Sequence, residues 1–154
     1  VMYPGGDYLF VGRSNRTNEG GIQVLRDTFE TKLGIQVIDV PNVTDDALHL
    51  KSVVTHLDTN TILAPTGPLG DDILNAMKAS DRGFEYIVRL PDLPACNVVS
   101  VNGHILAPAT QCQETKDILK KETTLRNLQL HYVDMSEFAK IDGALTCCSI
   151  LLDI

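Results

Sequence analysis

Residues 95–107 have the sequence Ala-Cys-Asn-Val-Val-Ser-Val-Asn-Gly-His-Ile-Leu-Ala, and this stretch decides the fold class. Two mostly apolar runs, 96–101 and 104–107, flank Asn102-Gly103. An Asn-Gly pair between two such runs is the strongest short-range signal for a β-hairpin, because both residues tolerate the positive φ angles of a two-residue turn. A helical pattern over 114–126 and a further strand-like segment follow. The local unit is therefore strand, strand, helix, strand.

The same unit recurs on both sides of this stretch with a period of about 48 residues. Ala47, Ala95 and Ala144 are spaced 48 and 49 residues apart, and a serine follows each of them five residues later. A period of this length indicates a repeat architecture in which each unit buries a face against its neighbours. The predicted elements are strands over 7–11, 35–40, 48–57, 61–64, 84–90, 96–101, 104–107, 128–133 and 145–152, and helices over 20–33, 70–79, 114–126 and 135–140.

The chain holds about three such units. Two are complete and lie between about residues 47 and 143; the unit before them lacks its first strand, and a lone first strand follows them. A closed ring of β-rich units typically needs at least four. We therefore expect an α/β fold that forms part of a larger circular domain, with the missing units before residue 1.

Composition and charge exclude several classes of function. The 154 residues are 44% hydrophobic and 21% charged, which is typical of a soluble globular protein, and no apolar run approaches the roughly 18 residues of a membrane span. A net charge of −7 argues against nucleic acid and anionic membranes as partners. The chain start does not resemble a signal sequence, so we expect a cytoplasmic protein. Its four cysteines lack zinc-site spacing, so no metal is expected.

Three segments combine chemically useful residues: Gly-Arg-Ser-Asn-Arg-Thr-Asn at 12–18, Ala-Leu-His-Leu-Lys-Ser at 47–52, and residues 135–149, which end in Leu-Thr-Cys-Cys-Ser. The last two segments carry the starts of equivalent first strands. Such strand starts converge on the axis of a ring, so His49 and Cys147 are expected to meet in space. Thiol-imidazole pairs are usually built from residues far apart in sequence.

Together these segments resemble dimethylarginine dimethylaminohydrolase, of the guanidine-modifying (pentein) superfamily, whose fold is a propeller of five β/α modules. The resemblance runs from about Asp7 to the last residue. Residues 10–18 resemble the family's arginine-bearing loop, 48–52 its catalytic histidine strand, and 142–149 its nucleophile strand. By this resemblance the whole chain is the C-terminal part of a pentein propeller domain, built from strand-strand-helix-strand modules, with about three of the five present.

The resemblance also implies roles for individual residues. Cys147 is the nucleophile, and His49 is the general acid and base. Arg16 clamps the α-carboxylate of the substrate, for which a planar two-pronged guanidinium is suited. Ile141 and Asp142 contact the amino end of the substrate through their backbone. The family chemistry needs no metal and no organic cofactor.

The implied reaction hydrolyses N-methylated arginines to citrulline and methylamines, within arginine metabolism and nitric oxide regulation. A polarizable thiolate can attack the guanidinium carbon, which is a poor electrophile because its charge is delocalised. His49 then protonates the departing amine, and an amidino-thioether remains on Cys147. Water activated by the neutral imidazole releases citrulline. The partner is thus a small cationic substrate.

The chain departs from the family pattern in the residues that hold the guanidinium group of the substrate. In the family, carboxylates from preceding modules hold this group, and no acidic residue of the chain falls on a matching position. The segment 3–7 resembles an Asp-Gly-Gly-Asp stretch of the family, but Pro4 replaces the first acid. We therefore expect this chain alone to be weakly active or inactive.

Two alternative functions stay open. An arginine deiminase or an amidinotransferase would use the same cysteine, histidine and arginine, although the Thr-Cys-Cys-Ser and Leu-His-Leu-Lys-Ser motifs favour the hydrolase. The chain could instead be a truncated, non-catalytic isoform that forms homodimers, or associates with the missing modules, through its open faces.

The remaining cysteines and histidines have simpler interpretations. Cys148 follows the nucleophile on the predicted strand, so it should face the opposite side and be structural. Cys96 and Cys112 are expected to be inert. The other histidines, at positions 56, 104 and 131, are expected on the surface or in hairpins.

Overall fold

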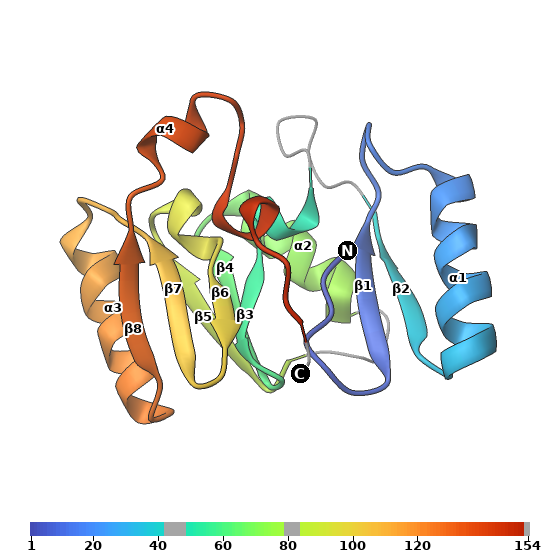
Figure 1. Cartoon of the computed structure of the whole chain (residues 1–154), viewed down its shortest axis with the longest axis horizontal. Helices are drawn as coiled ribbons and strands as arrows, with labels where there is room; N and C mark the ends of the chain where they lie inside the picture. The colour runs from blue at the N-terminus through green and yellow to red at the C-terminus, as the bar shows by residue number, and fades with distance from the viewer. Residues whose placement is uncertain (42–48, 79–83, 153–154) are drawn as a thin grey trace.

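Three small sheets stand side by side, and a long helix accompanies each of them (Figure 1). This computed structural model describes residues 1–41, 49–78 and 84–152. The fold is mixed α/β, as the sequence predicts. No helix in the described part of the chain is long and apolar enough to cross a membrane.

The second and third sheets have the same topology. In each, the first two strands are antiparallel, and the third strand pairs in parallel with the second after a helical crossover. The second contains β3 (Thr55–Asp58), β4 (Thr61–Pro65), α2 (Pro68–Lys78) and β5 (Tyr86–Leu90). The third contains β6 (Val99–Val101), β7 (His104–Pro108), α3 (Gln113–Leu125) and β8 (Gln129–Val133). This order confirms the predicted strand-strand-helix-strand unit, including the hairpin at Asn102-Gly103.

The first sheet is a shorter version of this unit. Strands β1 (Tyr8–Gly12) and β2 (Gln36–Val40) pair in parallel across helix α1 (Glu19–Leu33). A single residue, Met2, occupies the position of the missing first strand: its N–H donates to the Phe10 carbonyl at 2.8 Å and its carbonyl accepts from the Phe10 N–H at 2.9 Å. The predicted absence of a first strand is therefore correct except for this antiparallel bridge.

Two hydrophobic cores join neighbouring sheets. One core packs Phe10 and Val40 of the first sheet against Ile62 and Ala64 of the second. Another packs the second sheet against the third, and its members include Leu57, Leu63, Val88, Ile105 and Ala107. A third, smaller core lies within the first unit, where Leu9, Val11 and Val37 pack against Ile22 of α1. Burial of apolar area in these cores stabilises the fold.

Two predicted strands, over 48–57 and 145–152, differ from the structure, and both lie where a new unit of the repeat begins. Within 48–57, residues 50–52 form the 3₁₀ helix η1 (Leu50–Ser52), and the strand starts only at Thr55. Val53 and Val54 are both buried, which breaks the alternation that a half-buried strand requires. Likewise, 145–148 forms the 3₁₀ helix η3 (Leu145–Cys148), and 149–152 is not paired as a strand. Ala47 and Leu48, with the predicted helix end at residue 79, lie outside the described residues.

The 3₁₀ helices and the short segments beside them position the residues of the candidate active site. The third unit also opens with such a helix, η2 (Leu93–Cys96), so its strand starts at Val99 rather than at the predicted residue 96. The short helix α4 (Ser136–Ala139) confirms the prediction over 135–140. From α4 the chain descends to η3 and crosses the front of the molecule between β1 and β3 (Figure 1).

Candidate active site

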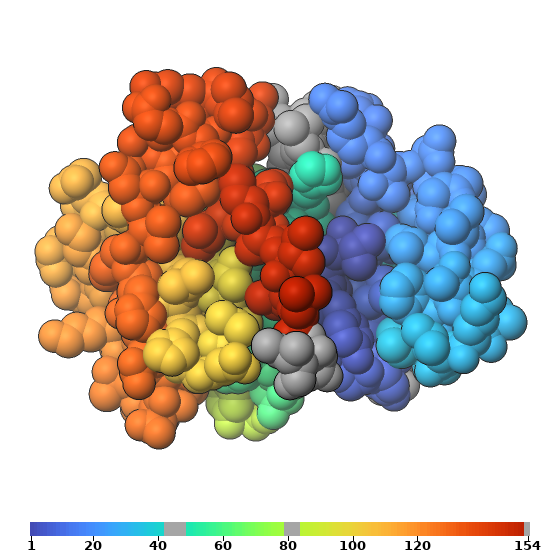
Figure 2. Space-filling model, viewed as in Figure 1, coloured from blue at the N-terminus to red at the C-terminus, as the bar shows by residue number. Residues whose placement is uncertain are grey.

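A pocket of about 300 Å³ brings together the two residues predicted to form the catalytic pair. His49, Lys51, Thr146 and Cys147 line it together with Val1. The C-terminal segment lies across the surface against the N-terminal residues in the space-filling view (Figure 2). His49 and Cys147, which are 98 positions apart in the sequence, therefore share one cavity.

The 3₁₀ helix η1 sets the position of His49. Leu50 is only 1% exposed and anchors this turn in the core, whereas His49 before it is exposed and has extended backbone angles. The Ser52 N–H donates to the His49 carbonyl at 3.0 Å, which closes the turn. Because one apolar side chain points inward, the residues on either side of it, His49 and Lys51, line the pocket.

The nucleophile candidate lies on the 3₁₀ helix η3. Leu145 and Thr146 are buried, while Cys147 and Cys148 are both exposed. The N–H groups of both cysteines donate to the Ala144 carbonyl, at 3.0 and 3.2 Å. Cys148 was expected to be a structural residue on the opposite face of a strand. This is wrong, because a tight helical turn replaces the strand and leaves both thiols exposed.

Lys51 is a site residue to which the sequence analysis gave no role. It lines the pocket beside Cys147. Burial lowers the pKa of its amine below the usual range, and the charge interaction with Cys147 opposes that shift. The pocket thus presents a thiol, an imidazole and an amine, and none of its lining residues is a carboxylate. The sequence feature that could have identified Lys51 as a site residue is its position in the histidine motif, two residues after His49.

Arg16 lies in a separate pocket of about 360 Å³. The lining residues are Val1, Asn15, Arg16, Thr17, Asn18, Gly21 and Leu25. Val1 lines both pockets, so the arginine pocket is next to the thiol pocket. A tight turn holds the arginine-bearing loop: Ser14 and Thr17 exchange two backbone hydrogen bonds, and the Arg16 N–H donates to the Ser14 hydroxyl at 3.1 Å.

Ile141 and Asp142 lie on the turn between α4 and η3 and line neither pocket. Ile141 is 78% exposed, and Asp142 has a left-handed φ of 57°. The Gly143 N–H closes the turn by donating to the Phe138 carbonyl at 2.9 Å. A Cβ atom at Gly143 would lie 2.9 Å from that carbonyl oxygen, so the turn requires glycine. The N–H groups of Ile141 and Asp142 are used within the turn, where they donate to the Phe138 and Ala139 carbonyls at 3.1 and 3.2 Å.

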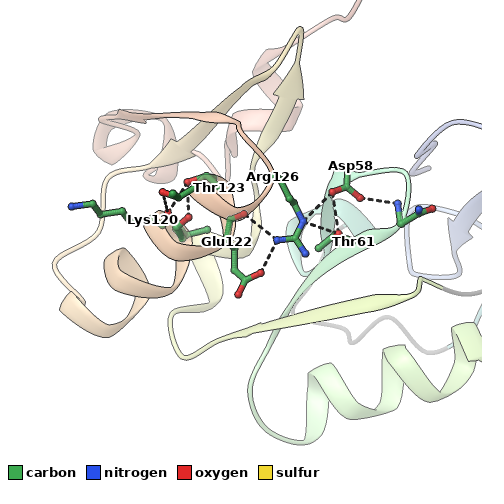
Figure 3. Close-up of polar contacts among 9 residues, drawn as sticks. Asp58, Thr61, Lys120, Glu122, Thr123 and Arg126 are labelled. Carbon is green, nitrogen blue, oxygen red and sulfur yellow. Dashed lines mark hydrogen bonds and ion pairs between the residues drawn. The ribbon is translucent and has the colours of Figure 1, made fainter.

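A larger pocket of about 420 Å³ lies elsewhere, between the turn joining β3 to β4 and the end of α3. Arg126 lines it, and its Nε and Nη1 donors are already used. They bind the carboxylates of Asp58 and Glu122 at 3.0 and 2.7 Å and the Thr61 hydroxyl at 3.0 Å (Figure 3). This pocket holds no thiol or imidazole, so we regard it as a structural contact.

Of the remaining cysteines, Cys96 fits the expectation that it is inert. Cys96 is fully buried, and burial, with a smaller contribution from Asp92, raises the pKa of its thiol to about 12. Cys112 is half-buried at the start of α3. Among the residues that the structure describes, no group of three or more His, Cys, Asp or Glu side chains could hold a metal ion.

The histidines outside the pocket lie on the surface or in hairpins, as predicted, with His56 in the hairpin of β3 and β4. His131 is exposed, and its Nε2 lies 2.9 Å from Nδ1 of His104 on the neighbouring strand. His56 is not a surface residue. It is half-buried in β3, and its Nδ1 is buried with no hydrogen-bond partner.

Comparison with known proteins identifies the family. No family model matches the chain. The chain is 35% identical over 150 residues to an N(G),N(G)-dimethylarginine dimethylaminohydrolase of Streptomyces coelicolor, covering 96% of this chain and 51% of the relative. It is 29% identical over 148 residues to the enzyme of the same name from Pseudomonas aeruginosa, covering 94% of this chain and 52% of the relative. The chain therefore spans about half the length of these curated relatives.

Solved structures give the same result. The structure of the Pseudomonas aeruginosa enzyme, a cysteine-to-serine variant complexed with citrulline, is similar with a TM-score of 0.71 and 26% identity, covering 95% of this chain and 51% of that one. A dimethylarginine dimethylaminohydrolase histidine variant, as an adduct with S-methyl-L-thiocitrulline, is similar with a TM-score of 0.73 and 26% identity, covering 95% and 52%. With the thiol and imidazole motifs in one pocket, these likenesses show that the chain belongs to the dimethylarginine dimethylaminohydrolase family of the guanidine-modifying (pentein) proteins.

Proposed function

We propose that this chain carries the nucleophile, the acid-base histidine and the carboxylate-binding arginine of an enzyme that hydrolyses N-methylated arginines to citrulline and methylamines. The observation that carries the proposal is the shared pocket of His49 and Cys147. The curated relatives are named for the same reaction class, which supports the choice of substrate.

In the proposed first step, the Cys147 thiolate attacks the guanidinium carbon of the bound substrate. The C–N bond to the methylated nitrogen breaks, and protonated His49 gives its proton to the leaving amine. The ammonium group of Lys51 lies beside the sulfur and attracts its negative charge. In the second step His49 takes a proton from water, the hydroxide attacks the amidino carbon, and citrulline leaves as the C–S bond breaks.

Arg16 is proposed to bind the α-carboxylate of the substrate. Its pocket adjoins the thiol pocket through Val1, so one elongated amino acid could reach from one to the other. Ile141 and Asp142 are proposed to contact the amino end of the substrate through their backbone carbonyls, since both residues are exposed and their N–H groups already donate within the turn. These three assignments rest on the family resemblance together with this arrangement.

Weak activity of the chain alone is part of the proposal. The thiol pocket is lined by two basic side chains and no carboxylate, so a guanidinium gains no opposite charge there. We further propose that the three sheets are consecutive modules of a five-module propeller, whose other modules supply the carboxylates. The repeated topology of the second and third sheets supports this arrangement.

The test is citrulline formation from dimethylarginine by the purified chain and two matched serine variants. Cys147→Ser should abolish the signal, whereas Cys148→Ser changes a neighbour that is also exposed and should retain most of it. The wild-type rate should fall well below that of the Streptomyces coelicolor relative assayed in parallel. Equal rates for the chain and the relative would contradict the proposed weakness. Activity surviving in Cys147→Ser would contradict the mechanism, and preference for arginine over dimethylarginine would indicate a deiminase.

S-methyl-L-thiocitrulline is a suitable probe of the same chemistry. A related enzyme with an altered histidine has been solved as an adduct with this compound. If Cys147 is the nucleophile, attack on the isothiourea carbon should expel methanethiol and leave the same amidino-thioether as the substrate would. This adduct can be assigned to one cysteine by peptide mass spectrometry.

A further inference from the structure

Asn97 joins the two segments that carry the pocket residues. Its side chain is buried, with 2% exposure, and it follows the 3₁₀ helix η2 of the third unit. Its Nδ2 donates to the Lys51 carbonyl at 2.5 Å and to the Thr146 hydroxyl at 2.9 Å. Its Oδ1 accepts from the Thr146 N–H at 2.9 Å. One amide therefore connects residues 46 positions before it and 49 positions after it.

The backbone of Asn97 is itself fixed on both sides. The Thr55 hydroxyl donates to the Cys96 carbonyl at 2.5 Å and accepts from the Val98 N–H at 3.2 Å. Thr55 is 1% exposed, so water does not compete for these bonds. The amide of Asn97 thus projects from a segment whose backbone is held by Thr55, and it can act as a fixed reference for the two segments that it contacts.

The residues bound by Asn97 are direct neighbours of the reacting groups. Thr146 immediately precedes Cys147, and Lys51 follows His49 by two positions. All four of these line the pocket, whereas Asn97 does not. Any effect of Asn97 on the chemistry must therefore act through the placement of η1 and η3.

The repeat explains why these three positions meet. Asn97 lies 48 residues after His49 and 49 residues before Thr146, which are the two spacings of the sequence repeat. Asn97 and Thr146, which are equivalent positions of successive units, are therefore hydrogen-bonded to each other, and Asn97 also bonds Lys51, two positions beyond its equivalent His49 in the preceding unit. Only a side chain with both a donor and an acceptor can satisfy a carbonyl on one segment and an N–H on the other.

We infer that Asn97 is a positioning residue that sets the distance between the Cys147 segment and the His49–Lys51 segment. This inference rests on the proposed function of Cys147 as nucleophile. Asn97→Ala removes all three bonds. Asn97→Asp keeps the shape and the acceptor for Thr146 but replaces the donor to the Lys51 carbonyl with a carboxylate oxygen, so it should separate the two segments while preserving packing.

The test compares alkylation rates of individual cysteines in the folded chain, resolved by peptide mass spectrometry after brief treatment with iodoacetamide. In the wild type, Cys147 should react faster than its exposed neighbour Cys148, because Cys147 alone faces His49 and Lys51 in the pocket. Both Asn97 variants should lower the ratio of the Cys147 rate to the Cys148 rate by about tenfold or more, as expected for loss of precise placement. The buried Cys96 reports global unfolding and should stay protected.

Ser100→Ala is the matched control. The Ser100 hydroxyl donates to the Leu57 carbonyl at 2.6 Å, so this variant also removes a hydrogen bond between the second and third units but touches neither pocket segment. It should leave the Cys147 to Cys148 ratio unchanged. Where citrulline formation is measurable, the Asn97 variants should lower kcat by roughly 10- to 100-fold with a smaller change in KM.

The outcomes separate the two claims. An unchanged ratio in Asn97→Asp with Cys96 still protected would overturn the positioning role and leave the proposed function intact. Equal reactivity of Cys147 and Cys148 in the wild type, together with no citrulline, would overturn both. If Asn97→Ala exposes Cys96, the comparison is made with Asn97→Asp alone.

Discussion

At the scale of single residues, His56 shows how burial changes a titrating group. It is half-buried in β3, and burial, followed by the positive charge of Lys51, lowers its pKa to about 4, while Asp58 opposes the shift. In the folded chain the His56 imidazole therefore stays neutral at pH values above about 4. In the unfolded chain an ordinary histidine has a pKa near 6.5.

The first prediction concerns stability against pH. Between about pH 6.5 and pH 4 the unfolded chain binds a proton at His56 that the folded chain does not, so the free energy of unfolding should fall as the pH is lowered through this window. The contribution is about 1–3 kcal/mol. Urea unfolding at several pH values should show a shallower fall for His56→Gln than for the wild type. If the free energy of unfolding fell equally with pH in His56→Gln and in the wild type, His56 would not be the cause of the fall.

At the scale of elements, α2 packs so closely on the end of β4 that only glycine fits. A Cβ atom at Gly70 would lie 2.0 Å from the Pro65 carbonyl oxygen, which is backbone and has no rotamer to change. The helix would have to move away from β4 and from the core that Ile73 and Met77 enter.

The second prediction compares two glycine-to-alanine changes. Gly70→Ala should destabilise the chain by about 2–3 kcal/mol through this overlap. Gly21→Ala in α1 meets nothing closer than 3.8 Å and should be neutral or stabilising by about 0.5–1 kcal/mol, because alanine is the better helix former. Thermal unfolding of both variants checks this. Equal changes in unfolding temperature for the two variants would contradict the prediction, because they would show that the contact between the Cβ atom added at position 70 and the Pro65 carbonyl costs no stability.

The elements also show what the sequence can and cannot predict. The hairpin at Asn102-Gly103 and the helices follow from local turn chemistry and apolar spacing, and the structure confirms them. The 3₁₀ helices η1 and η3 were predicted as strands, because periodicity alone cannot distinguish a strand from a helical segment in a short, mostly apolar run. The contact made by Asn97 depends on residues 46 and 49 positions away, which only the folded chain brings together.

For the candidate site, motifs predicted the members but not their surroundings. His49 and Cys147 were named from sequence and do share a pocket. Lys51 was visible in the histidine motif, yet its proximity to the thiol is a tertiary property. Arg16, Ile141 and Asp142 were predicted for one site, but they line no common pocket with the thiol in the described residues.

At the scale of the whole molecule, the units are held together by shared cores and by Arg126. This side chain is 18% exposed and reaches from the end of α3 to Asp58 and Thr61 of the second unit, while also pairing with Glu122 (Figure 3). The Tyr86 ring lies 5.8 Å from its guanidinium carbon. Loss of the arginine would remove the donor that binds the Glu122 carboxylate and the ion pair to Asp58, which keeps only its bonds from the Asn60 N–H and the Thr61 hydroxyl.

The third prediction tests this connection between units. Arg126→Met should lower the free energy of unfolding by about 1–3 kcal/mol, because it breaks a partly buried network rather than a surface pair. Lys140→Met removes the exposed pair with Glu137 and should cost less than about 0.5 kcal/mol. Urea denaturation of both variants gives the comparison. Similar losses in the two would contradict a special role for Arg126.

The central claim is that Cys147 is the nucleophile of a pocket completed by His49. The most direct measurement is peptide mass spectrometry of the His49→Gly chain after long incubation with S-methyl-L-thiocitrulline, since loss of the histidine should slow release of the adduct. We predict a covalent adduct on Cys147, absent from Cys148 and from a His49→Gly chain that also carries Cys147→Ser. A folded chain that forms no adduct, or forms it equally on Cys148, would contradict the claim.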